Sequence, residues 1–131
     1  HSYSNLTTGV ELITKLDDVH INLKQAIPCG LIVNELVSNC LKYAFKGMSS
    51  GKIYLRVQRV GVNLEIQVAD NGVGLPEDFD FETNESLGVY LVQALTDQLD
   101  GSLIVDNKHS DNALEWTTGA SFLVSFTPLT D

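Results

Sequence analysis

A chain of 131 residues is close to the commonest size of a single domain and can bury a hydrophobic core, so we expect one domain, 1–131. Hydrophobic residues make up 44% and charged residues 19%, as in soluble globular proteins. Eight Lys and Arg against seventeen Asp and Glu give a net charge of −9, which disfavours nucleic acid as a partner. No apolar run reaches the roughly 20 residues of a membrane-spanning helix, so no direct membrane contact is expected.

The two cysteines, Cys29 and Cys40, lie on one predicted helix, eleven positions apart. At helical rise this spacing is roughly 16 Å, too far for a disulfide. A reducing compartment is therefore the simpler prediction, and we expect a cytoplasmic domain. Whether a parent chain is anchored in a membrane stays open.

The N-terminal residues 1–9 are polar and read as a flexible lead-in. Residues 10–16 alternate in hydrophobicity and predict a strand. A turn at Asp17 and Asp18 would lead into a short second strand, 19–21, which pairs back on the first.

Residues 22–46 read as one long helix that begins with a capping box, because Gln25 follows Asn22 by three positions. At about 100° per residue, apolar side chains gather on one side of this helix and polar side chains on the other. The apolar stripe consists of Val33, Val37, Cys40 and Ala44, and the polar row consists of Glu35, Asn39, Lys42 and Lys46.

The polar row has the residue types of a metal and phosphate site. A carboxylate and an amide one turn apart, Glu35 and Asn39, can share a hydrated Mg²⁺, which takes only one or two protein oxygens. The amine of Lys42, one turn further on, can meet a phosphate. A solvated helix face with favourable Glu-to-Lys spacing explains the same row, and these residues alone leave both interpretations open.

Two alternating stretches, 53–58 and 64–68, are joined by the short connector 61–63 and predict an antiparallel hairpin. After the run 70–74, residues 75–85 carry five carboxylates and no sustained period, which indicates a loop. A helix is predicted from an N-cap at Ser86 to Leu99, with a stop at Gly101. Its inward-facing residues are Leu91, Val92, Leu95 and Leu99. A strand 102–106, a loop 107–113 and a strand or hairpin 114–126 complete the chain order.

Because the central strands are joined by a tight hairpin and not by helical crossovers, the order of elements predicts an α+β fold. We expect a two-layer α/β sandwich in which helices cover one face of a mixed, mostly antiparallel sheet. The same observation disfavours a Rossmann fold.

The run 70–74 (DNGVG) follows a buried strand, where glycine allows backbone to approach a ligand closely. An aspartate at such a strand end, Asp70, can accept a hydrogen bond from the exocyclic amino group of adenine. Ser86, Leu87 and Gly88 open a helix whose free N–H groups suit a phosphate. Taken alone, the first run is explained about as often by an ordinary Asp-Gly turn, and the second is better explained by a simple capped helix start.

Together these runs resemble a known set of motifs. Residues 34–43 (NELVSNCLKY) resemble the N box of the gyrase, Hsp90, histidine kinase and MutL ATPase superfamily. Residues 70–74 resemble its G1 box, 86–89 (SLGV) its G2 box, and 119–122 (GASF) its last motif, in the order of the family. Within the superfamily, residues 26–45 look most like the sensor histidine kinases of the HWE-like or HisKA_2 group. The resemblance implies a Bergerat-type ATP-binding fold.

The resemblance also implies roles for individual residues. Asn39 would be the Mg²⁺ ligand, Lys42 would reach the phosphates, and Asp70 would bind the adenine amino group. Glu35 occupies the position of a water-activating base in the gyrase and Hsp90 branch. Together with Lys42, which would reach the phosphates, Glu35 is therefore a candidate catalytic residue. The residues expected around ATP are Asn39, Lys42, Tyr43, Asp70, Gly72, Gly74, Leu87, Gly88 and Ser121.

The chain departs from the family at Ala120, where threonine is usual, so a hydrogen bond near adenine is lost or taken over by Thr118 or Ser121. None of the three histidines, His1, His20 and His109, lies in a phosphoacceptor helix pattern.

The resemblance thus implies the Mg·ATP-binding domain of a sensor histidine kinase, with phosphoacceptor and dimerisation helices and a response regulator as partners. An ATPase or an anti-sigma-type serine kinase of the same superfamily is one alternative. A non-catalytic nucleotide sensor or docking module is another.

Overall fold

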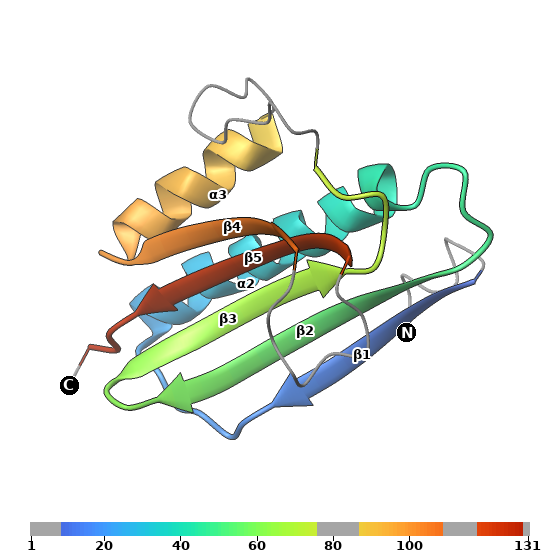
Figure 1. Cartoon of the computed structure of the whole chain (residues 1–131). Coiled ribbons are helices and arrows are strands. Elements are labelled where there is room, and N and C mark those ends of the chain that lie inside the picture. Colours follow the sequence, from blue (N-terminus) through green and yellow to red (C-terminus); the bar gives the residue numbers. More distant parts are fainter. Residues whose placement is uncertain (1–8, 76–86, 109–117, 130–131) are drawn as a thin grey trace.

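The computed structural model describes residues 9–75, 87–108 and 118–129. Its elements form two layers, in which the helices lie behind a five-stranded sheet (Figure 1). They are β1 (Val10–Leu16), α2 (Leu23–Asn39), the π-helical segment η1 (Cys40–Ala44), β2 (Gly51–Val60), β3 (Asn63–Asp70), α3 (Leu87–Gln98), β4 (Ser102–Lys108) and β5 (Thr118–Phe126). Neither α2 nor α3 is long and apolar enough to cross a membrane.

The sheet has the strand order β1-β2-β3-β5-β4 and is mixed. β1 runs parallel to β2, and the other neighbouring pairs are antiparallel. The hairpin between β2 and β3 turns at Gly61 and Val62, and Gly61 takes a positive φ of 61°. The predicted α+β sandwich and its central hairpin are confirmed.

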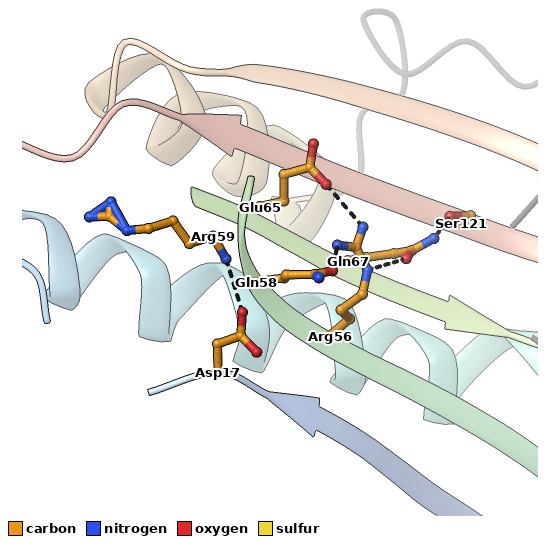
Figure 2. Close-up of polar contacts among 7 residues, drawn as sticks. All are labelled: Asp17, Arg56, Gln58, Arg59, Glu65, Gln67 and Ser121. Carbon is orange, nitrogen blue, oxygen red and sulfur yellow. Dashed lines mark hydrogen bonds and ion pairs between the residues drawn. The ribbon is translucent and has the colours of Figure 1, made fainter. Parts of the chain in front are cut away.

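The predicted second strand at 19–21 is wrong, because β1 does not form a hairpin. Val10 lies opposite Gly51 and Leu16 opposite Val57, in parallel register. Parallel neighbours need a long crossover, which α2 and η1 supply. Residues 17–22 are therefore a connector, in which the Asp17 carboxylate accepts a hydrogen bond from the Arg59 N–H at 3.3 Å (Figure 2).

Asn22 caps α2 as predicted, since its Oδ1 accepts from the Lys24 N–H at 2.8 Å. Gln25, which the capping pattern assigned to the helix start, is buried and holds the C-terminal segment. Its Nε2 donates to the Thr127 carbonyl at 3.3 Å, and its Oε1 accepts from the Leu129 N–H at 2.8 Å.

The prediction of one long α-helix to Lys46 is wrong beyond Asn39, where η1 follows with π-helical geometry. Tertiary contacts accompany this change, because the Ala44 carbonyl accepts from the Val73 N–H at 2.8 Å. A single period of 100° per residue therefore does not describe where Lys42 and Lys46 point. Single-turn π segments of this kind are frequent at functional sites.

The core lies between the helices and one face of the sheet. The inward face of α3 is as predicted, with Val92, Leu95 and Leu99 buried and Leu91 packed against the core. Among the described residues, the largest fully buried aliphatic side chains are Ile32, Leu36, Ile53, Leu64, Ile66, Val68, Val92 and Val124.

α3 ends in a Schellman motif, in which Gly101 N–H bonds to Thr96 C=O and Asp100 N–H to Asp97 C=O, both at 3.0 Å. The residue with positive φ is Asp100, at 53°, and not the predicted stop Gly101. Glycine is needed at 101 because a Cβ there would lie 2.6 Å from the Ser125 carbonyl oxygen. β4 is longer than predicted and takes in residues 107–108; residues 109–117 lie outside the described part of the chain.

Ile66→Ala should lower the free energy of unfolding by about 2–5 kcal/mol, because Ile66 is only 1% exposed and its removal leaves a cavity in the core. Ile104 is the matched control, since it is 51% exposed, and Ile104→Ala should change stability by less than about 0.5 kcal/mol. Urea unfolding of both variants measures the difference. Equal losses would contradict this placement of the core.

Candidate functional site

A buried carboxylate stands at the centre of the site. Asp70, the last residue of β3, is 2% exposed. Its Oδ1 accepts from the Gly72 N–H at 2.9 Å and from the Ala120 N–H at 3.3 Å. Its Oδ2 accepts from the Cys40 thiol at 3.5 Å. Donors from η1, β5 and the turn after β3 therefore hold one carboxylate in a defined orientation.

Glycines let the backbone close around this carboxylate. A Cβ at Gly72 would lie 2.1 Å from the Ala44 carbonyl oxygen. Gly119 has a φ of +97°, and a Cβ there would lie 2.1 Å from the Asp70 carbonyl oxygen. Gly74 takes a φ of +81°, a conformation that favours glycine. Any side chain at Gly72 or Gly119 would push apart the segments that position Asp70.

The polar row of the helix lies at and beyond the end of α2. Glu35 and Asn39 are partly exposed on its last turns, and Lys42 and Tyr43 are exposed in η1. Tyr43 is 56% exposed, and the Lys46 Nζ lies 5.7 Å from the centre of its ring, within the range of a cation–π contact. A tyrosine ring so exposed is available to flank a ligand.

Lys42 lies beside an open hollow of about 170 Å³. The hollow is lined by Val10, Leu41, Lys42, Phe45, Lys46, Met48, Ser49 and Ser50. Neither Asp70 nor Asn39 is among the residues that line this hollow.

Ser121 does not face Asp70. It pairs with Ala69 in the sheet, and alternation along the strand puts its side chain on the face opposite to Asp70. There its hydroxyl accepts from Gln67 Nε2 at 3.0 Å (Figure 2). The alternation of Phe122, Val124 and Phe126 was a signal for this orientation in the sequence. We therefore leave the Ser121 hydroxyl out of the site.

The sequence did not predict two of the groups that contact Asp70. The backbone N–H of Ala120 contacts the carboxylate, although the sequence drew attention only to the missing threonine side chain. Cys40 was assigned to the apolar stripe, and it is buried as expected, but its thiol also meets Asp70. An inward-facing cysteine in the middle of the N-box pattern was the available signal. Neither cysteine forms a disulfide, as predicted.

α3 begins at Leu87, so Leu87 and Gly88 open a helix as predicted. Ser86 and residues 76–85 of the predicted loop lie outside the described residues, as do His1, His109 and the first eight residues of the predicted lead-in. His20 is exposed in the connector after β1, with its Nε2 3.6 Å from Asp18.

Comparison with known proteins identifies the family. The profile of the histidine kinase-, DNA gyrase B- and HSP90-like ATPases matches residues 25–130. The blue-light-activated histidine kinase 2 of Erythrobacter litoralis (strain HTCC2594) is 33% identical over 98 residues, which are 74% of this chain and 28% of that protein. The sensor histidine kinase PdtaS of Mycobacterium tuberculosis is 37% identical over 75 residues, 56% of this chain and 15% of that protein.

The fold is shared with a solved structure, the histidine kinase domain of the Erythrobacter litoralis EL346 blue-light activated histidine kinase. The TM-score is 0.82 at 24% identity, over 97% of this chain and 56% of that one. The chain thus has the fold of a histidine kinase catalytic domain and belongs to the histidine kinase-, DNA gyrase B- and HSP90-like ATPase family. It spans less than a third of the length of either curated relative.

Gly72→Ala should destabilise the fold by about 1–3 kcal/mol, because the new Cβ would overlap the Ala44 carbonyl. Gly30→Ala is the control, since nothing lies within 4 Å of a Cβ there and alanine favours the helix by roughly 0.5–1 kcal/mol. Thermal unfolding of both variants measures the contrast. A Gly72→Ala protein as stable as the parent would show that the turn after β3 does not pack on η1 as described.

Proposed function

We propose that the chain is the Mg·ATP-binding catalytic domain of a sensor histidine kinase, which donates the γ-phosphoryl group of ATP to a histidine on the phosphoacceptor helices of its parent chain. The observation that carries the proposal is the buried, oriented Asp70 carboxylate within a family of ATPases. A response regulator would receive the phosphoryl group next, and the domain would act in the cytoplasm.

Asp70 recognises the base in this proposal. A buried carboxylate accepts hydrogen bonds and donates none, so it favours the exocyclic amino group of adenine over the carbonyl that guanine presents at the same ring position. The backbone at Gly72 and Gly74 shapes the pocket beside it. Tyr43 flanks the nucleotide, and the helix start at Leu87 and Gly88 lies near the phosphates.

The residues on the last turns of α2 fit a Mg²⁺ that is bound mainly by water and phosphate. The described residues contain no group of three or more His, Cys, Asp or Glu that could hold a metal by themselves. Asn39, with Glu35 one turn before it, offers the one or two oxygens that such an ion takes from a protein. When bound, the ion would neutralise charge on the β- and γ-phosphates.

Lys42 and the phosphoacceptor histidine carry out the transfer step. The exposed Lys42 amine orients the γ-phosphate, and a histidine imidazole attacks in line, so that the phosphorus–nitrogen bond forms as the bond to the ADP oxygen breaks. Glu35 has two candidate roles, a base that takes the proton from the attacking group or a residue that positions the site.

Glu35 also supports a second candidate function. A partly exposed carboxylate one turn from Asn39 could activate water, which would make the domain a slow ATPase. An anti-sigma-type serine kinase uses the same nucleotide site with a hydroxyl as acceptor. The product separates these possibilities, because phosphohistidine is acid-labile and phosphoserine is acid-stable.

Asp70→Asn should weaken ATP binding by about 1.5–3 kcal/mol, since the buried adenine amino group loses a charged acceptor. Titration calorimetry with ATP and GTP measures the effect, and GTP should bind poorly to the unchanged domain. Asp18→Asn is the control, because Asp18 is fully exposed in the connector after β1. Equal affinities of the unchanged domain for ATP and GTP would remove Asp70 as the residue that reads the base.

Residues 1–131 should bind ATP but hydrolyse it slowly, and adding the phosphoacceptor helices of the parent kinase in trans should yield an acid-labile phosphohistidine. In that mixture Glu35→Gln should reduce transfer about 10²–10⁴-fold if Glu35 is a general base and only slightly if it positions the site. Labelled ATP and acid treatment distinguish the products. Fast, Glu35-dependent hydrolysis by residues 1–131 alone would instead favour the ATPase.

A further inference from the structure

A buried thiol, that of Cys40, contacts the Asp70 carboxylate. Cys40 is the first residue of η1 and is 3% exposed. Its Sγ donates to Asp70 Oδ2 at 3.5 Å, while the backbone N–H groups of Gly72 and Ala120 donate to Oδ1. Backbone N–H groups thus bond to Oδ1, and the Cys40 side chain bonds to Oδ2.

This division fixes the carboxylate against rotation. Two donors on Oδ1 alone leave Oδ2 less restrained about the Cβ–Cγ bond. A thiol on Oδ2 limits that rotation and, being a weak donor, leaves the oxygen able to accept a second, stronger donor. A ligand amino group that approaches Asp70 then meets an acceptor whose direction is already set, so less ordering is needed on binding.

Only one of the two buried thiols meets the carboxylate. Cys29, in α2, is 9% exposed and Cys40 is 3% exposed, but the hydrogen bond to Asp70 Oδ2 comes from Cys40. Cys29 is therefore the matched control for the loss of a buried thiol.

We propose that Cys40 is a positioning residue for adenine recognition, whose thiol orients Asp70 Oδ2 toward the amino group of the base. The inference rests on the proposed function, in which Asp70 accepts that amino group. Cys40 acts through Asp70 and does not touch the reacting phosphate. It therefore tunes selectivity for adenine and not the affinity for nucleotides in general.

The experiment compares two ligands and three variants by titration calorimetry. The ligands are ADP and purine riboside 5′-diphosphate, which lacks only the 6-amino group. Cys40→Ala should weaken ADP binding about 3- to 10-fold, the range of one lost hydrogen bond, and leave binding of the analogue unchanged. Cys40→Ser, which keeps a donor, should restore ADP binding. Cys29→Ala removes the other buried thiol and should affect neither ligand.

Two outcomes overturn the inference. In the first, Cys40→Ala weakens the binding of both ligands equally, which is the result expected of a purely structural role. In the second, Cys40→Ala binds ADP with the affinity of the parent protein. A parent protein that does not prefer ADP over the analogue would instead contradict the proposed role of Asp70, so the two failures are distinguishable.

A second measurement does not depend on the stability of Cys40→Ala. In the Cys29→Ala protein the infrared S–H stretching band belongs to Cys40. Because ADP and the thiol share Asp70 Oδ2, this band should shift when ADP binds and should stay in place with the analogue. A band that does not respond to ADP overturns the inference.

Discussion

The structure around the candidate site depends on one buried side chain, the Asp70 carboxylate. A carboxylate removed from water is costly unless hydrogen bonds replace its hydration, and here the Gly72 and Ala120 N–H groups and the Cys40 thiol do so. These donors belong to segments that are far apart in the chain. The segments approach closely only because Gly72 and Gly119 carry no side chain. The requirement to satisfy one carboxylate therefore explains why η1, β5 and the turn after β3 meet.

The register of the sheet places this carboxylate. On the face away from the helices, Arg56 is 9% exposed and its guanidinium donates to Gln67 at 2.9 Å and to Glu65 at 3.1 Å (Figure 2). Gln67 in turn donates to Ser121, so that side chains of β2, β3 and β5 are joined across three strands. A slip of one residue would turn Asp70 to this face and out of the site. The polar network thus favours the register in which Asp70 faces the helices.

The π-helical segment connects the helix layer with the site. η1 brings the Cys40 thiol to Asp70 and the Ala44 carbonyl to the Val73 N–H. It also carries Lys42 and Tyr43, whose side chains are exposed. One short segment therefore contributes both a buried contact to the Asp70 carboxylate and two exposed side chains. This arrangement agrees with the frequent occurrence of π segments at functional sites.

The sequence by itself determined the sheet hairpin, the inward face of α3 and the motif that contains Asp70, because these depend on hydrophobic period, turn residues and short-range spacing. The sequence also sufficed to recognise the family, since the motifs occur along the chain in the order that the family has. Tertiary structure alone decided three things. It paired β1 with β2 in parallel, because strand partners are chosen by long-range packing. It changed α2 into η1 after Asn39, where the Ala44 carbonyl bonds outside the helix. It put the Ala120 N–H and the Cys40 thiol on Asp70, because contacts between residues 30 and 50 positions apart leave no local pattern in a sequence.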